Sequence, residues 1–422
     1  MKTLIAPWST DRHNHWKNVK LKYIFTEVKE KNYKNLDLPI LSLSYGQIIR
    51  RNRAINDGLT PASFSTYNIV KPGDIVLRLT DLQNDQTSLR SGIVRESGLI
   101  TSAYITLRCS TIIYPEYAAL LFRHYDHCKV FYSLGSGIRQ SSTFSEIGNL
   151  PIILPSLFEQ NLIAKKARTI NLTLDKIELQ QKNIRDSLKE YRNSLITRAV
   201  SKGLNPNVPM RDSGISCIGS IPNHWEISTL GRICHSMRNG YVGPTAGIFR
   251  TEGVKYIQSL HVKDGEIFFN KKEYYVEEDW ANKHPKIYKG NLLIVQSGDI
   301  GQVAIVRDEF SGCNCHALII CNLNTTKIDP DYLSYYFQSK PGRFLLLQTK
   351  TGLGLPHLNT GKICFTKVLV PSLPEQRAIA EECKLIDKTI KELRSLLSTQ
   401  IENLQNYRNS VISKAVVGEL DS

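Results

Sequence analysis

The strongest candidates for chemistry in this 422-residue sequence are a group of soft metal ligands. Cys313, Cys315, His316 and Cys321 lie close together, and thiolate and imidazole are groups that bind zinc. Paired cysteines of structural zinc sites are usually separated by two or more residues, whereas only Asn314 separates Cys313 from Cys315. The surrounding apolar residues alternate as in a strand, so we expect buried cysteines in a sheet and no metal site.

Other motifs of catalytic type are isolated. Gly352-Leu-Gly354 and Gly135-Ser-Gly137 lack the Lys-Ser/Thr pair that follows a phosphate-cradling loop, so we expect tight turns there. Glu27-Val-Lys29 has the composition of part of a nuclease carboxylate set, but an isolated Glu-x-Lys is common by chance and is expected on a solvated face. The Asn/Asp-Pro-Pro-aromatic tetrapeptide of adenine methyltransferases does not occur. We therefore expect a protein without an active site and without a bound cofactor.

Residues suited to nucleic-acid contact are more numerous. The chain has 54 Lys and Arg against 39 Asp and Glu, and its net charge of +15 suits a polyanionic partner. Arg and Gln pair with guanine and adenine edges, while Lys mostly binds phosphates. For any single residue the alternative is an ordinary solvated surface position. The candidate DNA-contacting residues, from one basic cluster and two loops, are Arg50, Arg51, Arg53, Arg139, Gln140, Ser141, Lys350 and His357.

The elements that would position these residues are duplicated. Pro155-Ser-Leu-Phe-Glu-Gln160 recurs as Pro371-Ser-Leu-Pro-Glu-Gln376, and Tyr191-Arg-Asn-Ser194 recurs as Tyr407-Arg-Asn-Ser410. Both motifs recur after the same number of residues, so neither copy has gained or lost one between them. The period far exceeds the roughly 20–50 residues of solenoid repeats. It indicates a duplicated module made of a domain and a long helix.

Each copy contains a long stretch in which apolar residues step by three and four, the pattern of a coiled-coil seam. We expect two long helices that pack on each other, antiparallel if a two-fold axis relates the modules. The single Gln in each seam either sets the register or points sideways at the seam edge. The predicted seam residues are Ile163, Ile170, Leu174, Ile177, Gln181, Ile184, Leu188, Ile386, Ile390, Leu393, Leu397, Gln400 and Leu404.

The rest of the chain has short β-branched runs separated by Gly, Asp and Asn, which indicates strand-rich globular domains. The expected fold is α/β (mixed α+β), with two globular domains separated by an antiparallel coiled coil of two long helices and related by a pseudo-two-fold repeat. We expect domain 1 at residues 1–157, the first helix at 158–203, a linker at 204–220, domain 2 at 221–373 and the second helix at 374–422. The helices keep their sequence while the domains diverge, so we expect the two domains to bind different things.

The N-terminal residues Met1–Trp8 are too short and mixed for a signal peptide, and no apolar run reaches membrane-spanning length. The nine cysteines are irregularly spaced, which argues against a disulfide framework. We expect a cytoplasmic protein with no membrane partner.

The repeated motifs and the linker resemble one known family. A duplicated Pro-Ser-Leu-x-Glu-Gln that leads a long helix closing in Tyr-Arg-Asn-Ser is similar to the specificity subunits of type I restriction-modification systems (HsdS). The segments 203–214 and 219–225 also resemble this family, and the resemblance covers essentially the full length. Two departures are minor: Cys217 stands where the family usually has Trp, and Phe158 where it has a short residue or Pro.

The resemblance implies a non-catalytic, sequence-specific DNA-recognition subunit. Its two target-recognition domains would each read one half of a bipartite, asymmetric site in double-stranded DNA. Its helices would fix the spacer between the half-sites and dock two modification (methyltransferase) subunits, and restriction (translocase/endonuclease) subunits would join them. S-adenosylmethionine, ATP and Mg²⁺ would belong to those partner subunits, and none to this chain. The alternative from another class is a coiled-coil adaptor whose end domains bind proteins.

Overall fold

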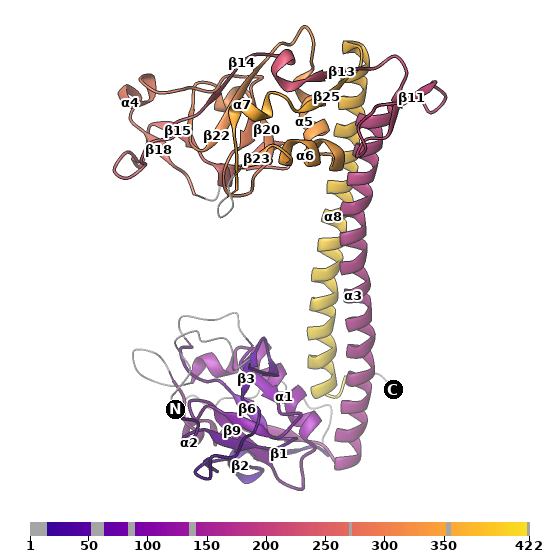
Figure 1. Ribbon diagram of the computed structural model, residues 1–422. Helices are drawn as coiled ribbons and strands as arrows, with labels where there is room; N and C mark the ends of the chain where they lie inside the picture. The colour runs from indigo at the N-terminus through magenta and orange to yellow at the C-terminus, as the bar shows by residue number, and fades with distance from the viewer. Residues whose placement is uncertain are drawn as a thin grey trace. The chain divides into compact units, whose positions relative to one another are not determined.

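The computed structural model describes residues 15–51, 63–82, 89–134, 141–269, 272–351 and 356–419. The chain divides into two compact units (Figure 1). Unit 1 contains Met1–Gln181 and Ser398–Ser422, and unit 2 contains Lys182–Leu397. Each unit therefore includes part of both long helices, which are α3 (Leu157–Lys202) and α8 (Leu373–Val416).

Unit 1 combines short strands with one covering helix. Its four-stranded antiparallel sheet has the order β2-β9-β6-β7, and β1, β3 and β5 pair with β10, β4 and β8. Tyr117, Leu121 and Phe122 of α1 are fully buried and pack in one cluster with Ile75 and Leu107 of this sheet. The elements are β1 (Lys17–Lys20), β2 (Phe25–Glu27), β3 (Leu41–Ser44), β4 (Gln47–Arg50), β5 (Asn68–Val70), β6 (Ile75–Leu77), β7 (Ser91–Ile93), β8 (Gly98–Ile100), β9 (Ile105–Cys109), β10 (Pro151–Leu154), α1 (Pro115–His127), α2 (Phe144–Ile147) and two 3-10 turns, η1 (Leu21–Tyr23) and η2 (Val130–Ser133).

Unit 2 has the same core and more elements around it. Its four-stranded antiparallel sheet has the order β14-β22-β19-β20, and β15 pairs with β18 and β21 in a smaller sheet. The elements are β11 (Met210–Asp212), β12 (Ser220–Pro222), β13 (Glu226–Thr229), β14 (Cys234–Asn239), β15 (Val254–Ile257), β16 (Val262–Lys263), β17 (Glu266–Ile267), β18 (Tyr275–Val276), β19 (Leu292–Val295), β20 (Val303–Ile305), β21 (Asn314–Cys315), β22 (Leu318–Leu323), β23 (Lys350–Thr351), β24 (His357–Leu358), β25 (Lys367–Val370), α4 (Glu278–Asn282), α5 (Pro330–Gln338), α6 (Lys340–Leu347), α7 (Thr360–Ile363), η3 (Leu230–Ile233), η4 (Ser259–His261) and η5 (Asp308–Phe310).

The two units repeat one topology. The sheet β2-β9-β6-β7 corresponds to β14-β22-β19-β20, and the closing pair β1·β10 corresponds to β13·β25. α1 corresponds to α5, and a Pro occupies the first helical position of both, where its fixed φ favours helix initiation. The predicted mixed class of helix and strand is confirmed.

A buried glutamine at the start of each long helix ties that helix to its unit. Gln160 is fully buried; its Nε2 donates to the carbonyls of Ile112 (3.1 Å) and Pro155 (2.8 Å), and its Oε1 accepts from the amide of Tyr114 (2.7 Å). Gln376 makes the same three bonds in unit 2, to the Lys327 and Pro371 carbonyls at 3.0 and 2.8 Å and from the Asp329 amide at 2.7 Å. The Gln of the repeated Pro-Ser-Leu-x-Glu-Gln motif is thus a clamp between helix and domain, and each set of three bonds is called the glutamine clamp below.

The preceding Glu of the motif holds the start of the unit. Glu159 accepts from the rings of His15 (2.8 Å) and Trp16 (3.1 Å). Burial by itself raises the pKa of the Glu159 carboxyl, but hydrogen bonds from Ser156, His15 and Trp16 outweigh burial and lower this pKa to about 2. In unit 2, Glu375 accepts from His224 and Trp225, each at 3.0 Å. The equivalent Glu of each motif therefore binds the His-Trp pair at the start of its own unit.

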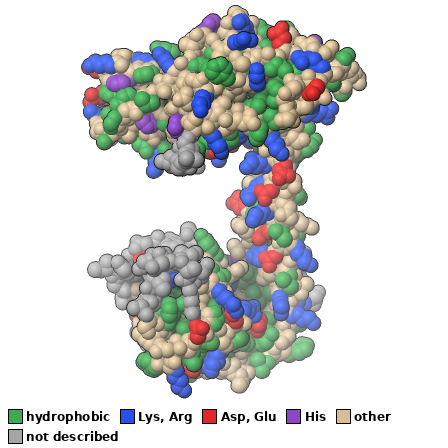
Figure 2. Space-filling model, viewed as in Figure 1, with side chains coloured by type: hydrophobic (Ala, Val, Ile, Leu, Met, Phe, Trp, Pro, Cys, Tyr) green, Lys and Arg blue, Asp and Glu red, His purple; other side chains and the backbone are tan. Residues whose placement is uncertain are grey.

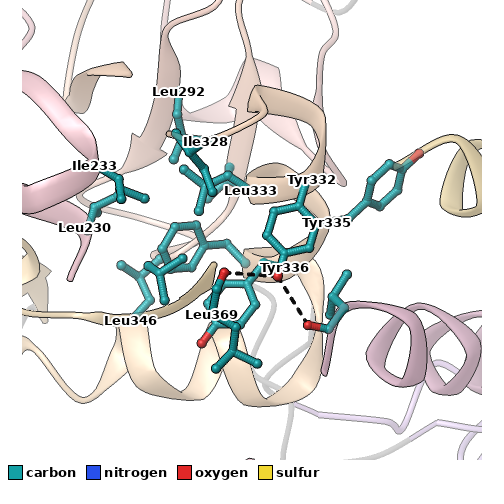
Figure 3. Packing of buried hydrophobic residues seen from close by; sticks show 14 of the residues in the cluster. Leu230, Ile233, Leu292, Ile328, Tyr332, Leu333, Tyr335, Tyr336, Leu346 and Leu369 are labelled. Carbon is teal, nitrogen blue, oxygen red and sulfur yellow. Dashed lines mark hydrogen bonds between the residues drawn. The ribbon is translucent and has the colours of Figure 1, made fainter. Parts of the chain in front are cut away.

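The C-terminal end of a long helix completes the core of each unit. In unit 2, the hydroxyl of Tyr332 donates to the carbonyls of Leu369 (3.0 Å) and Val200 (3.5 Å), as Figure 3 shows from the side of α5. Val200 lies near the end of α3 and is fully buried in the cluster of unit 2. In unit 1, fully buried Val416 near the end of α8 packs in the cluster that contains Tyr117. Each unit is therefore closed by the end of the helix that begins in the other half of the sequence.

Part of the predicted linker is folded as a β-hairpin. β11 and β12 form an antiparallel hairpin with Met210 opposite Pro222, and the guanidinium of Arg211 donates to the carbonyl of Trp225 at 2.7 Å. Gly203, after the last turn of α3, has φ +78°, and a Cβ there would lie 3.3 Å from the Trp225 ring. Glycine is therefore favoured where the chain leaves the helix against this tryptophan.

Two cysteines of the candidate metal group, Cys315 and Cys321, lie in strands of unit 2. Cys315 in β21 and Cys321 in β22 are fully buried, and burial raises the pKa of the Cys315 thiol to about 12. No three His, Cys, Asp or Glu side chains among the described residues are grouped to hold a metal ion. Within the same residues, no helix has the length and apolar character needed to cross a membrane.

The glutamine clamp predicts a local stability effect. Gln376→Ala removes three hydrogen bonds to buried backbone groups, so we expect the free energy of unfolding of unit 2 to fall by about 2–4 kcal/mol. Urea unfolding followed by tryptophan fluorescence measures this, since Trp225 is buried in unit 2. Exposed Gln405→Ala on α8 is the control and should change stability by less than about 0.5 kcal/mol. Equal effects of both substitutions would contradict the clamp.

The end of α8 predicts a pH dependence in unit 1. His124 of α1 lies 2.9 Å from the Ser413 hydroxyl, and burial lowers its pKa from 6.5 to about 4. Between these values the unfolded chain binds a proton that the folded unit does not, so stability is lost as the pH falls from about 6.5 to 4. The hydrogen-exchange protection factors of residues 411–417, which correct for the pH dependence of intrinsic exchange, should fall over this range in the wild type, and less in His124→Gln. An unchanged slope in the variant would exclude His124 as the cause.

Candidate nucleic-acid interface

The basic cluster lies at the end of the β3–β4 hairpin in unit 1. Arg50 is exposed at the end of β4, and its Nε donates to both carboxylate oxygens of Glu96, at 2.8 and 3.0 Å. These bonds lower the pKa of Glu96 and raise that of Arg50. Arg51 is half-buried and its amide donates to the Ile40 carbonyl at 2.8 Å, while Arg53 lies outside the described residues.

The two predicted loops end at equivalent places in the two units. The amide of Ser142 donates to the Leu79 carbonyl at 2.9 Å, and the amide of Leu358 donates to the Gln296 carbonyl at 3.0 Å. The exposed residues immediately before these anchors are Ser141 and His357, both predicted as DNA contacts.

The remaining loop candidates are divided between described and other residues. Lys350 is exposed on β23, which pairs with β24 so that Thr351 lies opposite His357. The His357 ring lies 3.2 Å from the Thr351 hydroxyl. Arg139 and Gln140 lie outside the described residues. The structure thus brings Lys350 and His357 together on one hairpin.

Positive charge does not gather in one strong patch on the face shown in Figure 2, where Lys and Arg side chains are scattered over both units. Such a distribution suits contacts with phosphates along a duplex, and it leaves the choice of bases to particular side chains.

The predicted seam residues lie on α3 and α8 with graded burial. In unit 1, Leu174 and Gln181 are buried and Gln400 is exposed. In unit 2, Ile184 and Leu393 are 48% and 41% exposed, more than the seam pattern predicts, because a pair of helices buries only a narrow stripe of each. The half-buried members are Ile163, Ile170, Ile177, Leu188, Ile386, Leu397 and Leu404, and Ile390 is buried.

The two seam glutamines contact each other within unit 1. Gln181 Nε2 donates to Gln400 Oε1 at 3.3 Å, and the Gln181 side chain is 9% exposed. Nearby, Arg408 donates to Asp175 (2.8 Å) and Glu178 (3.1 Å). Residue numbers rise along α8 as they fall along α3, so the two helices are antiparallel in this unit.

The Arg of each Tyr-Arg-Asn-Ser motif bridges the helices. In unit 2, Arg192 donates to Asp387 at 3.1 Å and to Gln338 of α5 at 3.1 Å, and Asp387 also accepts from the Tyr335 hydroxyl at 3.0 Å. Burial lowers the pKa of Arg192, but its bonds to Asp387 outweigh this and raise it. Sequence reasoning identified the motif and missed this role, although an Arg repeated at the same place in both copies was the available signal.

The described sequence and geometry agree with one family. Residues 222–403 match the type I restriction modification DNA specificity domain. The fold matches a chain from a structure described for complex assembly and conformational transition of the type I R-M system, with TM-score 0.68, 14% identity and coverage of 96% of this chain and 98% of that one. It also matches the HsdS subunit of Thermoanaerobacter tengcongensis, with TM-score 0.53, 15% identity and coverage of 96% and 97%.

The chain is similar to HsdS specificity subunits over most of its length. Curated relatives are about 25% identical to it over the aligned residues. The specificity subunit of the type I restriction enzyme StySPI from Salmonella potsdam is 25% identical over 96% of this chain and 89% of its own length. The EcoBI specificity subunit from Escherichia coli is 25% identical over 63% of this chain. This chain matches 58% of the EcoBI subunit's length and 62% of that of the MjaVIII subunit from Methanocaldococcus jannaschii.

The two interhelical arginines predict unequal effects. Arg192 and Asp387 are 17% and 33% exposed, whereas Arg408 is 24% exposed and pairs with Asp175 and Glu178, which are 59% and 31% exposed. Because the Arg192–Asp387 pair is the less exposed of the two, we expect Arg192→Met to lower the free energy of unfolding by about 1–3 kcal/mol and Arg408→Met by less than about 1 kcal/mol. Urea unfolding of both variants measures the difference. Adding Asp387→Leu to Arg192→Met should restore part of the loss, and equal losses for both arginines would contradict the assignment.

Proposed function

We propose that the chain is the sequence-specific DNA-recognition subunit of a type I restriction-modification complex. Each unit reads one half of a bipartite, asymmetric site in double-stranded DNA. The family match, the similarity to curated specificity subunits and the net charge of +15 support this function.

The main support for the proposal is that the two units have the same buried hydrogen bonds but different exposed side chains. Gln160 and Gln376 make the same three backbone bonds, and Tyr117 and Tyr332 donate to equivalent carbonyls, those of Ile153 and Leu369, both at 3.0 Å. The exposed positions of the two units carry different side chains. Ser141 of one unit, for example, corresponds to His357 of the other. Two units that share these bonds and differ in surface suit a site whose two halves differ in sequence.

The two long helices suit the spacing and docking roles of such a subunit. α3 has 46 residues and α8 has 44, and each contributes residues to both units. We propose that they fix the spacer between the half-sites and bind two modification subunits. Exposed apolar residues on both helices, such as Leu172 (52%), Leu179 (60%) and Leu396 (62%), suit contact with partner proteins.

The chemistry of the complex is proposed to lie in partner subunits of the cytoplasmic assembly. Modification subunits would supply S-adenosylmethionine and adenine methylation, and restriction subunits would supply ATP- and Mg²⁺-dependent translocation and cleavage. This chain would supply the choice of sequence.

The proposal predicts that the two units specify their half-sites independently. Residues 1–154 are exchanged for those of a relative with a different target, and the complex with two modification subunits is expressed in a host. Mapping of methylated adenines should show a change in one half-site only, because Gln160 and both long helices are retained and the partners of Gln160 in the exchanged domain are backbone groups. The exchange of residues 221–370 is the matched control and should change only the other half-site.

Two outcomes would contradict the proposed function. A complex with modification subunits that binds neither random nor target duplex in a gel-shift assay would favour a protein adaptor. A change of both half-sites after either exchange would show that the units do not act independently.

A further inference from the structure

Each unit carries a β-ribbon with the same unusual turn. In unit 1 the β3–β4 ribbon pairs Ser44 with Gln47, and in its turn Tyr45 and Gly46 have φ +46° and +73°. In unit 2 the β16–β17 ribbon turns at Asp264 and Gly265, with φ +49° and +88°. Two successive positive φ values are those of a type I′ turn, which is favoured in two-residue hairpins because it matches the strand twist. Tyrosine adopts this backbone region far less readily than Asn, Asp or Gly.

A long polar side chain from the covering helix lies under each turn. In unit 1 Arg123 of α1 is largely buried, and its Nη2 donates to the carbonyls of Gly46 (2.5 Å) and Ser91 (3.1 Å). A Cβ added to Gly46 would overlap this guanidinium. In unit 2 a Cβ on Gly265 would overlap the amide of Gln338, at the end of the equivalent helix α5. In unit 1 the turn is bonded to Arg123, and in unit 2 the Gln338 side chain lies against the equivalent turn.

The β3–β4 ribbon has one apolar face and one polar face. Leu41 and Leu43 are buried, and Leu43 packs closely on Gly92 of β7, where a Cβ would meet its side chain. Gln47 is exposed on the opposite face, Ile49 on that face is 45% exposed, and Tyr45 at the tip is 87% exposed. The ribbon thus presents amide, hydroxyl and apolar groups outward from a fixed base.

The chemistry of this face suits duplex DNA. The major groove admits a two-stranded ribbon, and Gln pairs with adenine edges while apolar side chains contact thymine methyl groups. From β3 to Arg51 the ribbon carries two arginines, Arg50 and Arg51, and no carboxylate of its own. Arg50 is paired with Glu96, which offsets its charge, and Arg51 at the base of the ribbon suits the phosphates that flank a groove.

We propose that the β3–β4 ribbon enters the major groove of duplex DNA and contacts bases of one half-site through Tyr45, Gln47 and Ile49, and that Arg123 is its positioning residue. This inference rests on the proposed function of the chain as a DNA-recognition subunit. The β16–β17 ribbon, whose exposed residues are Lys263, Asp264 and Glu266, presents charged groups and hence a different surface at the equivalent place.

The full chain, in complex with modification subunits, tests the contacts. Its target duplex is first identified by mapping methylated adenines with the wild-type complex. Tyr45→Ala and Gln47→Ala should each weaken binding to this duplex by roughly 10-fold or more while binding to random duplex stays within about 3-fold. The matched controls are Tyr23→Ala and Tyr33→Ala, whose side chains are 67% and 77% exposed elsewhere in unit 1, and both should bind like wild type.

The positioning role is tested by the methylated motif itself. Arg123→Met and Gly46→Ala should relax base preference in the half-site read by unit 1 and leave the other half-site unchanged. A purely structural loss would lower methylation at every site without altering the motif. Thermal unfolding identifies a variant that fails to fold, and Tyr45→Ala, at an exposed position, then decides the ribbon's role alone.

The possible outcomes distinguish a failure of the ribbon assignment from a failure of the proposed function. Specific DNA binding that is unchanged by Tyr45→Ala and Gln47→Ala would overturn the ribbon assignment while the proposed function stands. Binding lost equally for target and random duplex would also overturn it, since phosphate contacts alone would explain that result. If the wild-type complex binds no DNA, the proposed function fails and the ribbon assignment fails with it.

Discussion

The structure depends on two buried side-chain amides. Gln160 and Gln376 are fully buried, and each satisfies two carbonyls and one amide where a long helix, the end of a strand and the start of a domain helix meet. Without a partner at this junction, these backbone groups would be buried and unsatisfied, at a cost of about 1–3 kcal/mol each. The direction in which each long helix leaves its unit is set here. The helix contacts, the position of the His-Trp pairs and the closing of each core follow from that direction.

The second constraint is the exchange of helix ends between the halves of the sequence. Val200 belongs to the first helix and is buried in unit 2, while Val416 belongs to the second helix and is buried in unit 1. Neither domain buries its core with its own repeat alone. Folding of each unit therefore requires residues from both halves of the chain, and the interhelical contacts of Arg192 and Arg408 form as part of the same process.

Sequence reasoning reached the parts of this fold that depend on local periodicity. The stepping of apolar residues and the repeated motifs predicted α3, α8 and the duplication, and alternation predicted the buried strand cysteines Cys315 and Cys321. It could not assign the glutamine clamp, because two of the three partners of Gln160 are backbone atoms 46 and 48 residues away. It also missed the Tyr45–Gly46 turn, since a tyrosine with positive φ is stabilised by a tertiary contact with Arg123 and no local pattern predicts it. Of the candidate DNA contacts, Ser141 and His357 occupy equivalent loop ends, a relation that depends on strand pairing across each unit.

The clamps and the tyrosine hydroxyls share one property: every partner is a backbone atom. Gln160 and Gln376 bond to carbonyls and amides, and Tyr117 and Tyr332 donate to the carbonyls of Ile153 and Leu369. Such a junction is indifferent to the side chains that the domain carries at those positions. A domain can therefore diverge, or be replaced by recombination with a distant gene, without a compensating change in the helix that holds it. The same helices can then be inherited intact under many different target specificities.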